Sequence, residues 1–468
     1  MTIPSHANVL VIGGGNAGLC AAIAAQEAGA QVVLLEHSDQ QERGGNSKHT
    51  RNLRVMHNAP TATLDNSYSA QEYLDDLLKV TQGNMDQPLT EFMIEQSATL
   101  LPWLQRMGIH FQPSLSGTLS LSHTNAFFLG GGKALINAQY LTAERIGVKI
   151  FYHAEVTSIH LEDGAFKSAA VTNRGFKQTI TADSVIFASG GFQANKAWMK
   201  EIWGCVADNF IIRGTPFNQG TVLKSLLAQD VASVATPEQC HAVAIDARSP
   251  KYDGGIVTRI DCISFSIVVN KNGKRFYDEG EDFWPKRYAI WGRLVAQQPE
   301  QIAYSIIDSQ VTEQFMPPVF PSMQANSIEE LAQLIAIEPS VLTATVTQYN
   351  NALASDKKTA QYNPKILDQC RTQGLTPEKT NWALPINKPP YYVYPLRPGI
   401  TFTYLGVKVN NKAQVLMNDG TASKNMYAAG EIMAGNILGQ GYCAGTGMTI
   451  GAVFGRIAGE AAACQLKK

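Results

Sequence analysis

The sequence lacks most of the features that mark metal-binding, secreted and nucleic-acid-binding proteins. Its seven cysteines are scattered, and none belongs to a CxxC pair of the kind that holds a metal, a redox disulfide or a c-type haem. Lys and Arg total 38 and Asp and Glu total 39, so no excess of positive charge is available for phosphate backbones. We therefore expect reduced, mostly buried thiols and no nucleic acid partner.

Long apolar segments are also missing. No uninterrupted apolar run approaches about 18 residues, the length of a membrane-spanning helix. The longest candidate, from Met448 to Leu466, contains Arg456 and Glu460. The segment MTIPSHANVLVIGGG enters an apolar strand without the charged region or cleavage site of a signal peptide. These features predict a cytoplasmic protein, peripheral to the inner face of a membrane only through a partner.

The strongest local pattern is NVLVIGGGNAGLCAAIAAQEAGAQVVLLEH at residues 8–37, which predicts a strand, a glycine turn, a helix and a second strand. Glycines at this turn allow a close approach of the backbone to a pyrophosphate, and the helix N-terminus favours negative charge. Glu36, at the end of the second strand, is placed to accept hydrogen bonds from ribose hydroxyls. The pattern predicts a dinucleotide site whose turn consists of Gly13, Gly15, Asn16, Ala17 and Gly18.

Two later segments choose between FAD and NAD. ADSVIFASGGF at 182–192 is an apolar strand that ends in a small-residue turn, and residues 424–462 form a strand, an acid, a glycine-rich loop and a helix. The sequence has no second complete GxGxxG unit, which argues against a separate NAD(P)H domain. One nucleotide site with distant glycine-rich contributions suits an extended cofactor such as FAD.

Five ordered motifs give the chain a family resemblance. They are GGGNAG with Glu36, GGNSKHTRN at 44–52, FASGGF at 187–192, NKNGKRFYDEG at 270–280, and AAGEIMAGN with AGTGMTIG near the end. With these motifs the chain resembles the flavoproteins of the fumarate reductase and succinate dehydrogenase superfamily, and within it the FAD-dependent tricarballylate dehydrogenases. The resemblance covers nearly the whole chain.

The resemblance implies a role for each flavin-binding segment. Glu36 would hold the adenosine ribose and Glu431 would meet the ribityl chain. The start of the last helix would face the pyrimidine end of the flavin, where a helix N-terminus stabilises the negative charge of the reduced ring. The other positions assigned to the cofactor are Gly44, Gly45, Asn46, Ser47, Ser189, Gly190, Thr446, Gly447 and Met448.

One departure from the family concerns how the cofactor is attached. In membrane-bound succinate dehydrogenases a histidine of the corresponding stretch is covalently bound to the flavin. That position is Ser47 in this chain, with His49 two residues away. We therefore expect non-covalent FAD.

The pattern of residues changes between Ala235 and roughly Ile400. Alternating apolar stretches, amphipathic helical segments and proline-rich turns replace the glycine-rich pattern there. We expect an α/β fold, in which a Rossmann-like FAD-binding domain with a parallel sheet comprises residues 1–235 and 401–468. An α+β capping domain of residues 236–400 would be inserted in it and cover the substrate. The length of 468 residues agrees, because it exceeds what one core usually supports.

Dehydrogenation beside a carboxylate requires a hydride acceptor, a proton acceptor and cations that hold the carboxylates. In related fumarate reductases an arginine after a KRFxNE motif moves the proton. The stretch KRFYDEGEDFWPKRYAIW makes Arg287 the nearest counterpart, with Lys286 and Tyr288 as rivals. Arginine is a poor base because its pKa exceeds about 12. Tyr288, with an ordinary pKa of about 10, would have that pKa lowered by Lys286 and Arg287. The third interpretation is that Arg287 and Tyr288 only bind or pack.

Other departures bear on the substrate. The glutamate and second arginine that relay protons in the reductases align near Arg259 and Cys262, so that relay is missing here. The substrate-binding histidine of the reductases aligns with Thr401, and their late arginine aligns near Tyr442. Both differences argue against fumarate as the substrate and favour oxidation. Because arginine suits planar carboxylates, the candidate substrate-binding residues are Arg51, Arg54, His241, Arg397, Thr401 and Tyr442.

The sequence therefore predicts an enzyme that oxidises tricarballylate to cis-aconitate. By resemblance, electrons would pass to a membrane partner with iron–sulfur and haem centres; from the residues alone, a quinone or oxygen serves as well. One alternative is a 3-ketosteroid-type Δ1-dehydrogenase, which would use tyrosines in an apolar pocket with few cations. The others are a fumarate-reductase-like enzyme and a flavin-binding redox subunit without turnover.

Overall fold

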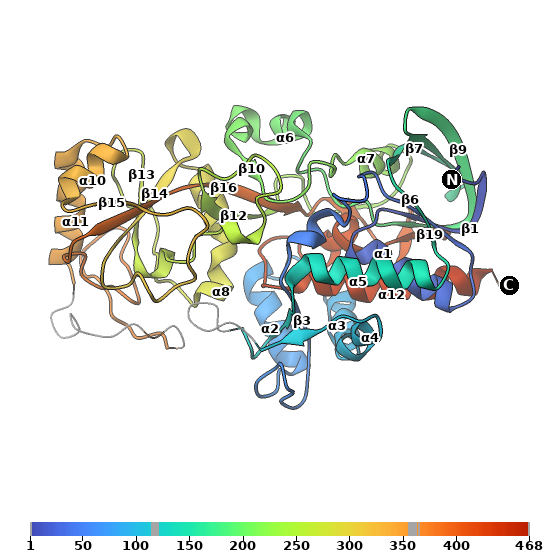
Figure 1. Ribbon diagram of the computed structural model, residues 1–468, viewed down its shortest axis with the longest axis horizontal. Coiled ribbons are helices and arrows are strands. Elements are labelled where there is room, and N and C mark those ends of the chain that lie inside the picture. Colours follow the sequence, from blue (N-terminus) through green and yellow to red (C-terminus); the bar gives the residue numbers. More distant parts are fainter. Residues whose placement is uncertain (1, 114–120, 354–362, 364–365, 467–468) are drawn as a thin grey trace.

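Two large β-sheets follow one another along the longest axis of the chain, and the N-terminus and C-terminus lie at the same end (Figure 1). The computed structural model describes residues 2–113, 121–353, 363 and 366–466. The first sheet and its helices form the half that contains both termini, and the second sheet forms the other half.

The first sheet has eight strands and a parallel centre. β1 pairs in parallel with both β2 and β9, and parallel pairing continues to β6 on one side and to β19 on the other. The apolar run of β1, residues 9–12, is almost completely buried, as expected for a strand covered on both faces. The strands in order are β18 (Gln414–Leu416), β19 (Ala422–Ala428), β9 (Phe176–Phe187), β1 (His6–Ile12), β2 (Val32–Leu35) and β6 (Lys149–Phe151), and the hairpin of β7 (Ala154–Glu162) and β8 (Ala165–Asn173) extends from β9.

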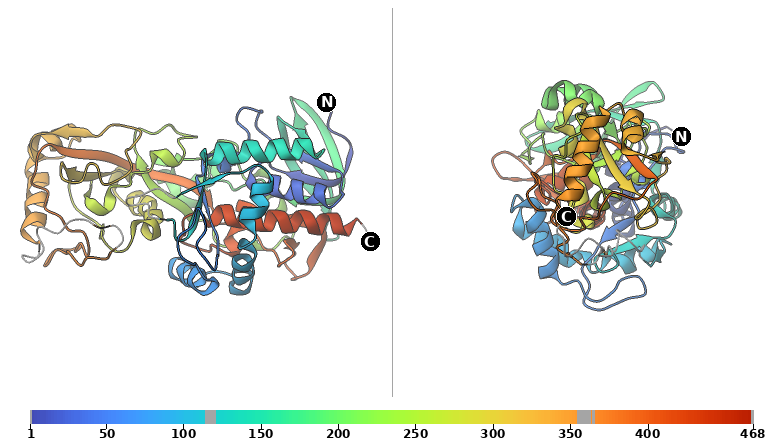
Figure 2. Two further views of the ribbon diagram at one scale, coloured as in Figure 1. Left: turned by 60° about the horizontal axis from the view of Figure 1, so that its bottom comes forward. Right: turned by 90° about the vertical axis from the view of Figure 1, so that its left-hand side faces the viewer.

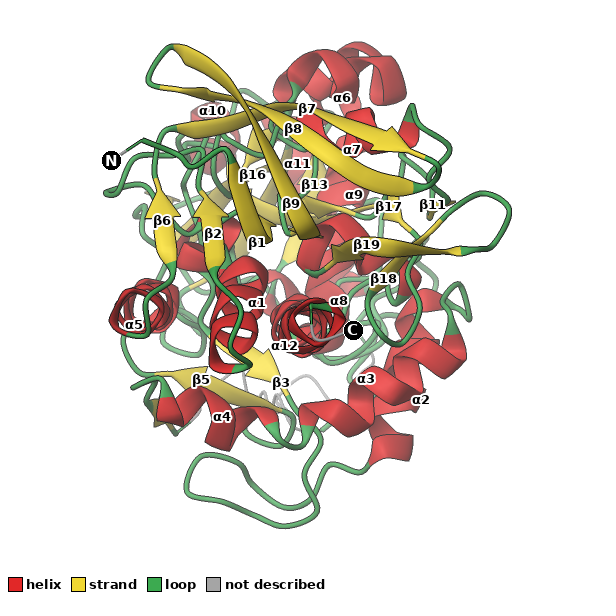
Figure 3. Cartoon of the chain, turned by 90° about the vertical axis from the view of Figure 1, so that its right-hand side faces the viewer, coloured by secondary structure: helices red, strands yellow, loops and turns green. Residues whose placement is uncertain are grey.

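Three helices lie on one face of this sheet: α5 (Gly131–Arg145), α1 (Asn16–Glu27) and α12 (Thr446–Gln465) (Figure 3). Small residues let α1 and α12 approach closely, since a Cβ atom added at Gly455 would lie 2.5 Å from the Ala17 carbonyl oxygen. The N-terminal ends of the two helices meet, and Asn16 Nδ2 donates to the Met448 carbonyl oxygen at 3.2 Å. Two segments that are far apart in the sequence thus contribute to one site.

A small sheet and several helices complete this half of the chain. The sheet lies against the start of α12: a Cβ atom added at Gly445 would lie 2.6 Å from the backbone nitrogen of Arg54. Its strands are β3 (Asn52–Arg54), β5 (Asn125–Phe128) and β4 (Phe111–Gln112). The remaining elements are α2 (Ala70–Thr81), α3 (Gln87–Ser97), α4 (Leu100–Arg106), α6 (Lys196–Trp203), α7 (Thr221–Leu227), and the paired strands β11 (Ser233–Val234) and β17 (Gly406–Val407).

The second sheet is organised around β16 (Tyr391–Thr403), the long orange-red strand that runs from the far end of the chain toward its middle (Figure 2). β16 pairs in parallel with β10 and antiparallel with β12, β14 and β15. The bounds of the other strands are β10 (Ile211–Ile212), β12 (Cys240–Asp246), β13 (Ile267–Asn270), β14 (Ala303–Asp308) and β15 (Met323–Ala325). The helices of this half are α8 (Trp284–Arg287), α9 (Trp291–Ala296), α10 (Ile328–Leu334) and α11 (Pro339–Asn351).

The far end of the second sheet has an apolar core of its own, in which Leu331 and Leu342 pack against Ile267 and Val393. The domain boundaries predicted at 235/236 and 400/401 stay a prediction, and the second of them lies inside β16. Five of the seven cysteines are buried, as the sequence predicted. Within the residues that the structure describes, we find no helix with the length and apolar character needed to cross a bilayer.

The contact between α1 and α12 gives a stability prediction. An alanine at Gly455 would favour an isolated helix by about 1 kcal/mol, but its methyl group would meet a backbone oxygen that cannot turn away. We expect Gly455→Ala to lower the free energy of unfolding by about 1–3 kcal/mol and to weaken cofactor retention. Glu460→Ala, on the exposed face of the same helix, is the control and should change stability by less than about 0.5 kcal/mol in denaturant unfolding.

Candidate active site

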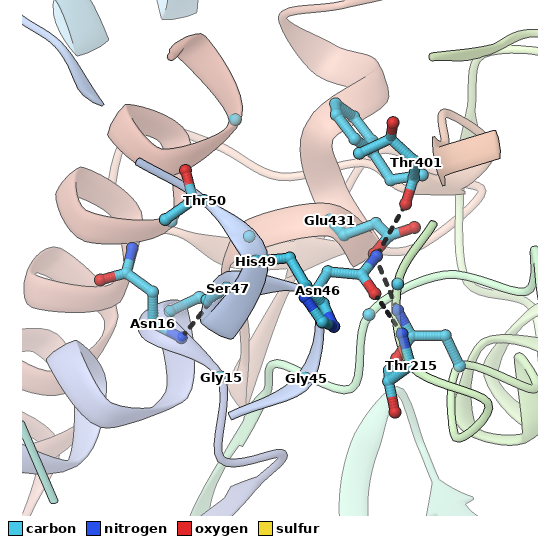
Figure 4. A pocket seen from close by; sticks show the side chains of 18 of the residues that line it. Gly15, Asn16, Gly45, Asn46, Ser47, His49, Thr50, Thr215, Thr401 and Glu431 are labelled. Carbon is cyan, nitrogen blue, oxygen red and sulfur yellow. Dashed lines mark hydrogen bonds between the residues drawn. The ribbon is translucent and has the colours of Figure 1, made fainter. Parts of the chain in front are cut away.

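One cavity collects residues from widely separated parts of the chain. Its wall includes the turn between β1 and α1, the short helical segment η1 (Gly45–His49), the turn after β9, the end of β16, the segment η8 (Gly430–Asn436) and the start of α12. Figure 4 shows side chains from several of these segments pointing toward a common space. The cavity has a nucleotide end near β2 and a cationic end near β12.

The nucleotide end is shaped by Glu36. Its carboxylate accepts hydrogen bonds from the backbone nitrogens of Gly14 at 3.1 Å and Ser38 at 2.9 Å. A Cβ atom at Gly14 would lie 2.1 Å from the Tyr140 hydroxyl oxygen and 2.6 Å from the carboxylate, so only glycine fits there. The exposed edge of this turn and the N-terminus of α1 provide the donors that a pyrophosphate needs.

The segment η1 is tied to both halves of the chain. Ser47 Oγ accepts from the Asn16 nitrogen at 3.1 Å. Asn46 Nδ2 donates to the Thr401 carbonyl oxygen at 2.7 Å, and Asn46 Oδ1 accepts from the Thr215 nitrogen at 3.0 Å (Figure 4). These contacts hold the middle of the cavity wall at the point where the flavin is expected.

Glu431 is a half-buried residue of the cavity wall. Its carboxyl oxygens accept from Asn218 Nδ2 and from the Thr403 nitrogen, each at 3.1 Å. Burial raises the pKa of Glu431 to about 8, with partial opposition from the donors at Thr403. A carboxyl group with this raised pKa is largely protonated near pH 7, and it can form hydrogen bonds with the hydroxyls of a polyol such as a ribityl chain.

The start of α12 forms the last part of the cofactor region. Gly447 and Met448 line the cavity in the first turn of this twenty-residue helix. Its N-cap, Gly445, has a φ of +84°, and a side chain there would collide with Asn125 Nδ2 at 2.3 Å. The positive end of the helix dipole therefore faces the cavity, as the stabilisation of a reduced flavin requires.

The predicted cofactor residues fit FAD, although three of them lie behind the cavity wall. Gly18 lets α1 meet β1, since its Cβ would lie 1.8 Å from the Gly13 carbonyl oxygen. Gly44 has a φ of +100° and lies against Ile136, and Thr446 is fully buried. The predicted positions that line the cavity are Gly13, Gly15, Asn16, Ala17, Glu36, Gly45, Asn46, Ser47, Ser189, Gly190, Glu431, Gly447 and Met448.

Three arginines, Arg51, Arg213 and Arg259, line the cationic end. Arg213 and Arg259 are 5% and 6% exposed, so their charges are largely removed from bulk water. Arg259 forms a bidentate pair with the buried Asp261, at 2.6 Å and 3.1 Å. Arg213 Nη1 donates to Thr401 Oγ1 at 2.7 Å, and Arg51 Nη1 contacts Met316 Sδ at 3.2 Å.

The three arginines repel one another, and Asp261, which pairs with Arg259, offsets only part of their positive charge. Burial and the nearby Arg259 lower the pKa of Arg213 to about 9, and the same two causes lower the pKa of Arg51 to about 10. Arg259 itself is buried, yet Asp261 raises its pKa. A bound anion would relieve this repulsion, so the cationic end favours negatively charged ligands.

Aromatic rings form the wall beside the arginines. His241 stacks on Tyr442 with ring centroids 3.9 Å apart, and it also contacts Phe402 at 5.5 Å and Tyr288 at 5.9 Å. Burial and the neighbouring Arg213 lower the pKa of His241, so its ring is neutral near pH 7. Its buried Nδ1 has no hydrogen-bond partner within the described part of the chain. The ring therefore carries an unsatisfied polar atom in the wall of the cavity.

The two candidate proton-transfer residues point in different directions. Tyr288 lines the cavity, and the Arg259 guanidinium lies 4.4 Å from its ring centroid. Arg287 does not line it: its guanidinium pairs with Glu281 and donates to the Tyr277 hydroxyl oxygen at 2.9 Å. Adjacent positions diverge because Arg287 ends the one-turn helix α8 and Tyr288 begins the following 3-10 turn.

The electrostatic expectation for Tyr288 was wrong. The pKa of Tyr288 is raised by burial, not lowered, and the cations that oppose this rise are Arg259, Arg213 and Arg51. Lys286, which was expected to lower it, pairs with Asp76 at 2.9 Å. The phenol is therefore protonated near neutral pH.

The structure does not bring all predicted substrate residues to the cavity. Arg51, His241, Thr401 and Tyr442 line it. Arg54 is buried elsewhere, where it pairs with Asp76 at 2.9 Å and donates to the Ala444 carbonyl oxygen.

Arg397 also lies outside the cavity wall, and its Nη1 donates to the Glu300 carbonyl oxygen at 2.8 Å. Arg213 and Arg259 were not among the predicted binding residues. Arg213 follows the two-residue strand β10, and Arg259 follows a single 3-10 turn, so neither belongs to a motif. The one available signal was the position of Arg259, where the reductases have part of their relay.

The comparisons with known proteins agree with this cavity. The family model described as "FAD binding domain" matches residues 8–450. A fumarate reductase (cytochrome) of Shewanella frigidimarina is 26% identical over 481 residues, which cover 98% of this chain and 78% of that protein. The open conformation of a flavocytochrome c3 fumarate reductase has a TM-score of 0.76 at 23% identity, covering 99% of this chain and 79% of that one. The 3-ketosteroid delta1-dehydrogenase from Sterolibacterium denitrificans has a TM-score of 0.75 at 17% identity, covering 98% and 100%.

The family match spans most of the chain and includes all the segments that line the nucleotide end. It confirms two predictions from the sequence, the α/β FAD-binding fold and FAD as the cofactor. The chain belongs to the FAD-binding domain family and is a flavin-dependent oxidoreductase of the fumarate reductase and succinate dehydrogenase superfamily, which acts on CH–CH groups.

Proposed function

We propose that this protein dehydrogenates a small polycarboxylate, oxidising tricarballylate to cis-aconitate. The observation that supports the proposal is the cationic end of the cavity, which is lined by Arg51, Arg213 and Arg259 and where Asp261 pairs, of these three arginines, with Arg259 alone. Two positive charges remain for substrate carboxylates, which guanidinium groups recognise well. A 3-ketosteroid would place an uncharged ring system among these charges, which argues against that alternative even though Tyr288 and Tyr442 are present.

Each part of the wall has a role in this reaction. When bound, FAD supplies the two-electron redox chemistry. Arg213 and Arg259 would bind a substrate carboxylate and stabilise the charge that develops when a proton leaves the adjacent carbon. The ionised form of Tyr288 would accept that proton, because its ring lines the cavity next to Arg259. His241 would donate or accept through its unpartnered nitrogen to orient the substrate.

Reduction of an unsaturated carboxylate is a second candidate. Burial keeps the Tyr288 phenol protonated, which suits a proton donor, and several relatives are named fumarate reductases. Oxidation remains the first choice because the aligned relay positions do not suit proton delivery. Arg259 is held by Asp261, and burial raises the pKa of the Cys262 thiol to about 12.

The electron acceptor is proposed from resemblance, and the location from the sequence features together with that resemblance. We propose that a membrane-bound partner with iron–sulfur and haem centres takes the electrons, and that the protein is cytoplasmic and peripheral to the inner face of the membrane through that partner. A relative bears the name fumarate reductase (cytochrome), which agrees with a haem-containing acceptor in this superfamily.

Anaerobic addition of tricarballylate should bleach the flavin absorbance of the FAD-loaded protein. Succinate and a 3-ketosteroid should bleach it poorly or not at all. Losing one charge-assisted hydrogen bond costs about 1.5–3 kcal/mol, so Arg213→Met and Arg259→Met should each slow reduction by roughly 10- to 100-fold. Arg145→Met, at an exposed end of α5, is the control and should leave the rate unchanged.

A flavin that stays oxidised with tricarballylate but is reduced by the steroid would contradict the proposed substrate class. To test the second candidate, the chemically reduced protein is mixed with cis-aconitate and with fumarate. Rapid reoxidation by fumarate, without reduction by tricarballylate, would assign the protein to the reductive direction.

Oxidation should become faster as the pH rises. The base form of Tyr288 is needed, and burial raises the Tyr288 pKa above its ordinary value, so the reactive fraction grows by up to about tenfold per pH unit between about pH 7 and 9. Tyr288→Phe should abolish this rise and slow flavin reduction by roughly 100-fold or more. If Arg287→Ala instead removes the pH dependence while Tyr288→Phe retains it, the assignment is reversed.

FAD should be bound without a covalent link. Ser47 occupies the position of the histidine that carries the link in other members, and His49 Nε2 is engaged by Asp253 Oδ1 at 2.6 Å. Acid precipitation of the FAD-loaded protein should release all flavin into the supernatant. Flavin that remains on the pellet, and is lost from the pellet in His49→Ala, would show that His49 forms a bond to the cofactor.

A further inference from the structure

The segment that leads into Tyr288 is held by two ion pairs from a distant helix. Lys79 Nζ of α2 lies 2.5 Å from Asp282 Oδ2, just before α8. Lys286 Nζ of α8 lies 2.9 Å from Asp76 Oδ1 of α2. In the first pair α2 supplies the lysine, and in the second pair it supplies the aspartate.

One of these pairs continues to the start of α12. Asp76 also accepts from Arg54 Nη1 at 2.9 Å through its second oxygen. The Arg54 side chain is buried, and its Nε donates to the Ala444 carbonyl oxygen at 3.1 Å, two residues before α12. A continuous chain of charged contacts therefore connects the flavin-facing helix end with α8.

The segment needs such support because it has little structure of its own. α8 has four residues, and a single helical turn is unstable in isolation. Trp284 fixes one side of it, with Nε1 donating to Asp261 Oδ1 at 2.8 Å. The other side faces α2, where the two lysine–aspartate pairs are found.

We propose that Lys79 and Lys286 are positioning residues that hold α8 so that Tyr288 faces the substrate. The inference rests on the proposed proton-transfer role of Tyr288. The aspartates are mostly buried, with side chains 9% and 12% exposed, whereas the lysines are 59% and 36% exposed. Removal of Lys79 would leave the mostly buried Asp282 without its charged partner, which costs more than the loss of an exposed pair. Removal of Lys286 would leave Asp76 paired with Arg54, so the link from α2 to α8 would be lost.

The test uses the FAD-loaded full chain and four variants, Lys79→Met, Lys79→Arg, Lys286→Met and Lys286→Arg. The methionine variants should lower the maximal rate of flavin reduction by tricarballylate roughly three- to tenfold. The apparent dissociation constant of tricarballylate should change by less than about twofold, because the arginines of the cavity are untouched. The arginine variants keep the charge and should recover most of the rate.

Lys167→Met provides the matched control. Lys167 is half-exposed and pairs with Glu162 at 2.9 Å in the β7–β8 hairpin, outside the cavity wall, so its removal should change neither quantity. Added salt should slow the unmodified enzyme more than Lys79→Met, because salt screens the partly exposed pairs.

Hydrogen–deuterium exchange without substrate separates this inference from the proposed function. Residues 282–290 should exchange faster in the two methionine variants than in the unmodified protein, the arginine variants and Lys167→Met. Unchanged exchange together with unchanged reduction rates would overturn the positioning role, even if Tyr288→Phe is inactive. If no polycarboxylate reduces the unmodified protein, the proposed function fails, and the exchange pattern alone decides whether the lysines hold the segment.

Discussion

Three guanidinium groups line one end of the cavity, and the carboxylate of Asp261 pairs with only one of them. This excess of positive charge shapes the chemistry that the protein can perform. Arg213 and Arg259 are nearly inaccessible to bulk water, so their charges are not neutralised by solvent. Asp261 offsets only one of them. The repulsion favours occupation by an anion, and it places the strongest stabilisation where a carboxylate substrate would develop further negative charge during proton loss.

The fold brings this cationic end next to the cofactor. β16 links the second sheet to the cavity through Thr401, which contacts both Asn46 and Arg213. On the other side, the close contact of α1 with α12 sets the glycine turn and the start of α12 against one another. Glycines are required at that contact because any side chain would separate the two helices. The same small residues therefore serve cofactor binding and stability.

Local motifs were sufficient to predict the nucleotide end, because strand, turn and helix there are contiguous and Glu36 follows at a fixed spacing. The cationic end depends on tertiary structure, and the sequence was less informative. Arg213 and Arg259 lie after very short elements and carry no motif. Arg54 was expected at the substrate because it is near the flavin-binding turn, but it lies outside the cavity wall, where it pairs with Asp76 of α2. Sequence spacing could not separate Arg287 from Tyr288, because one turn of helix decides which side chain enters the cavity.

A crystal structure of the FAD-loaded protein with a bound, unreactive tricarboxylate would test directly whether the arginines bind the substrate. We expect carboxylate oxygens within hydrogen-bond distance of Arg213 and Arg259, with the Tyr288 hydroxyl next to a carbon adjacent to a carboxylate. A ligand bound away from these arginines, or one contacted by Arg287 after release from Glu281, would contradict this expectation.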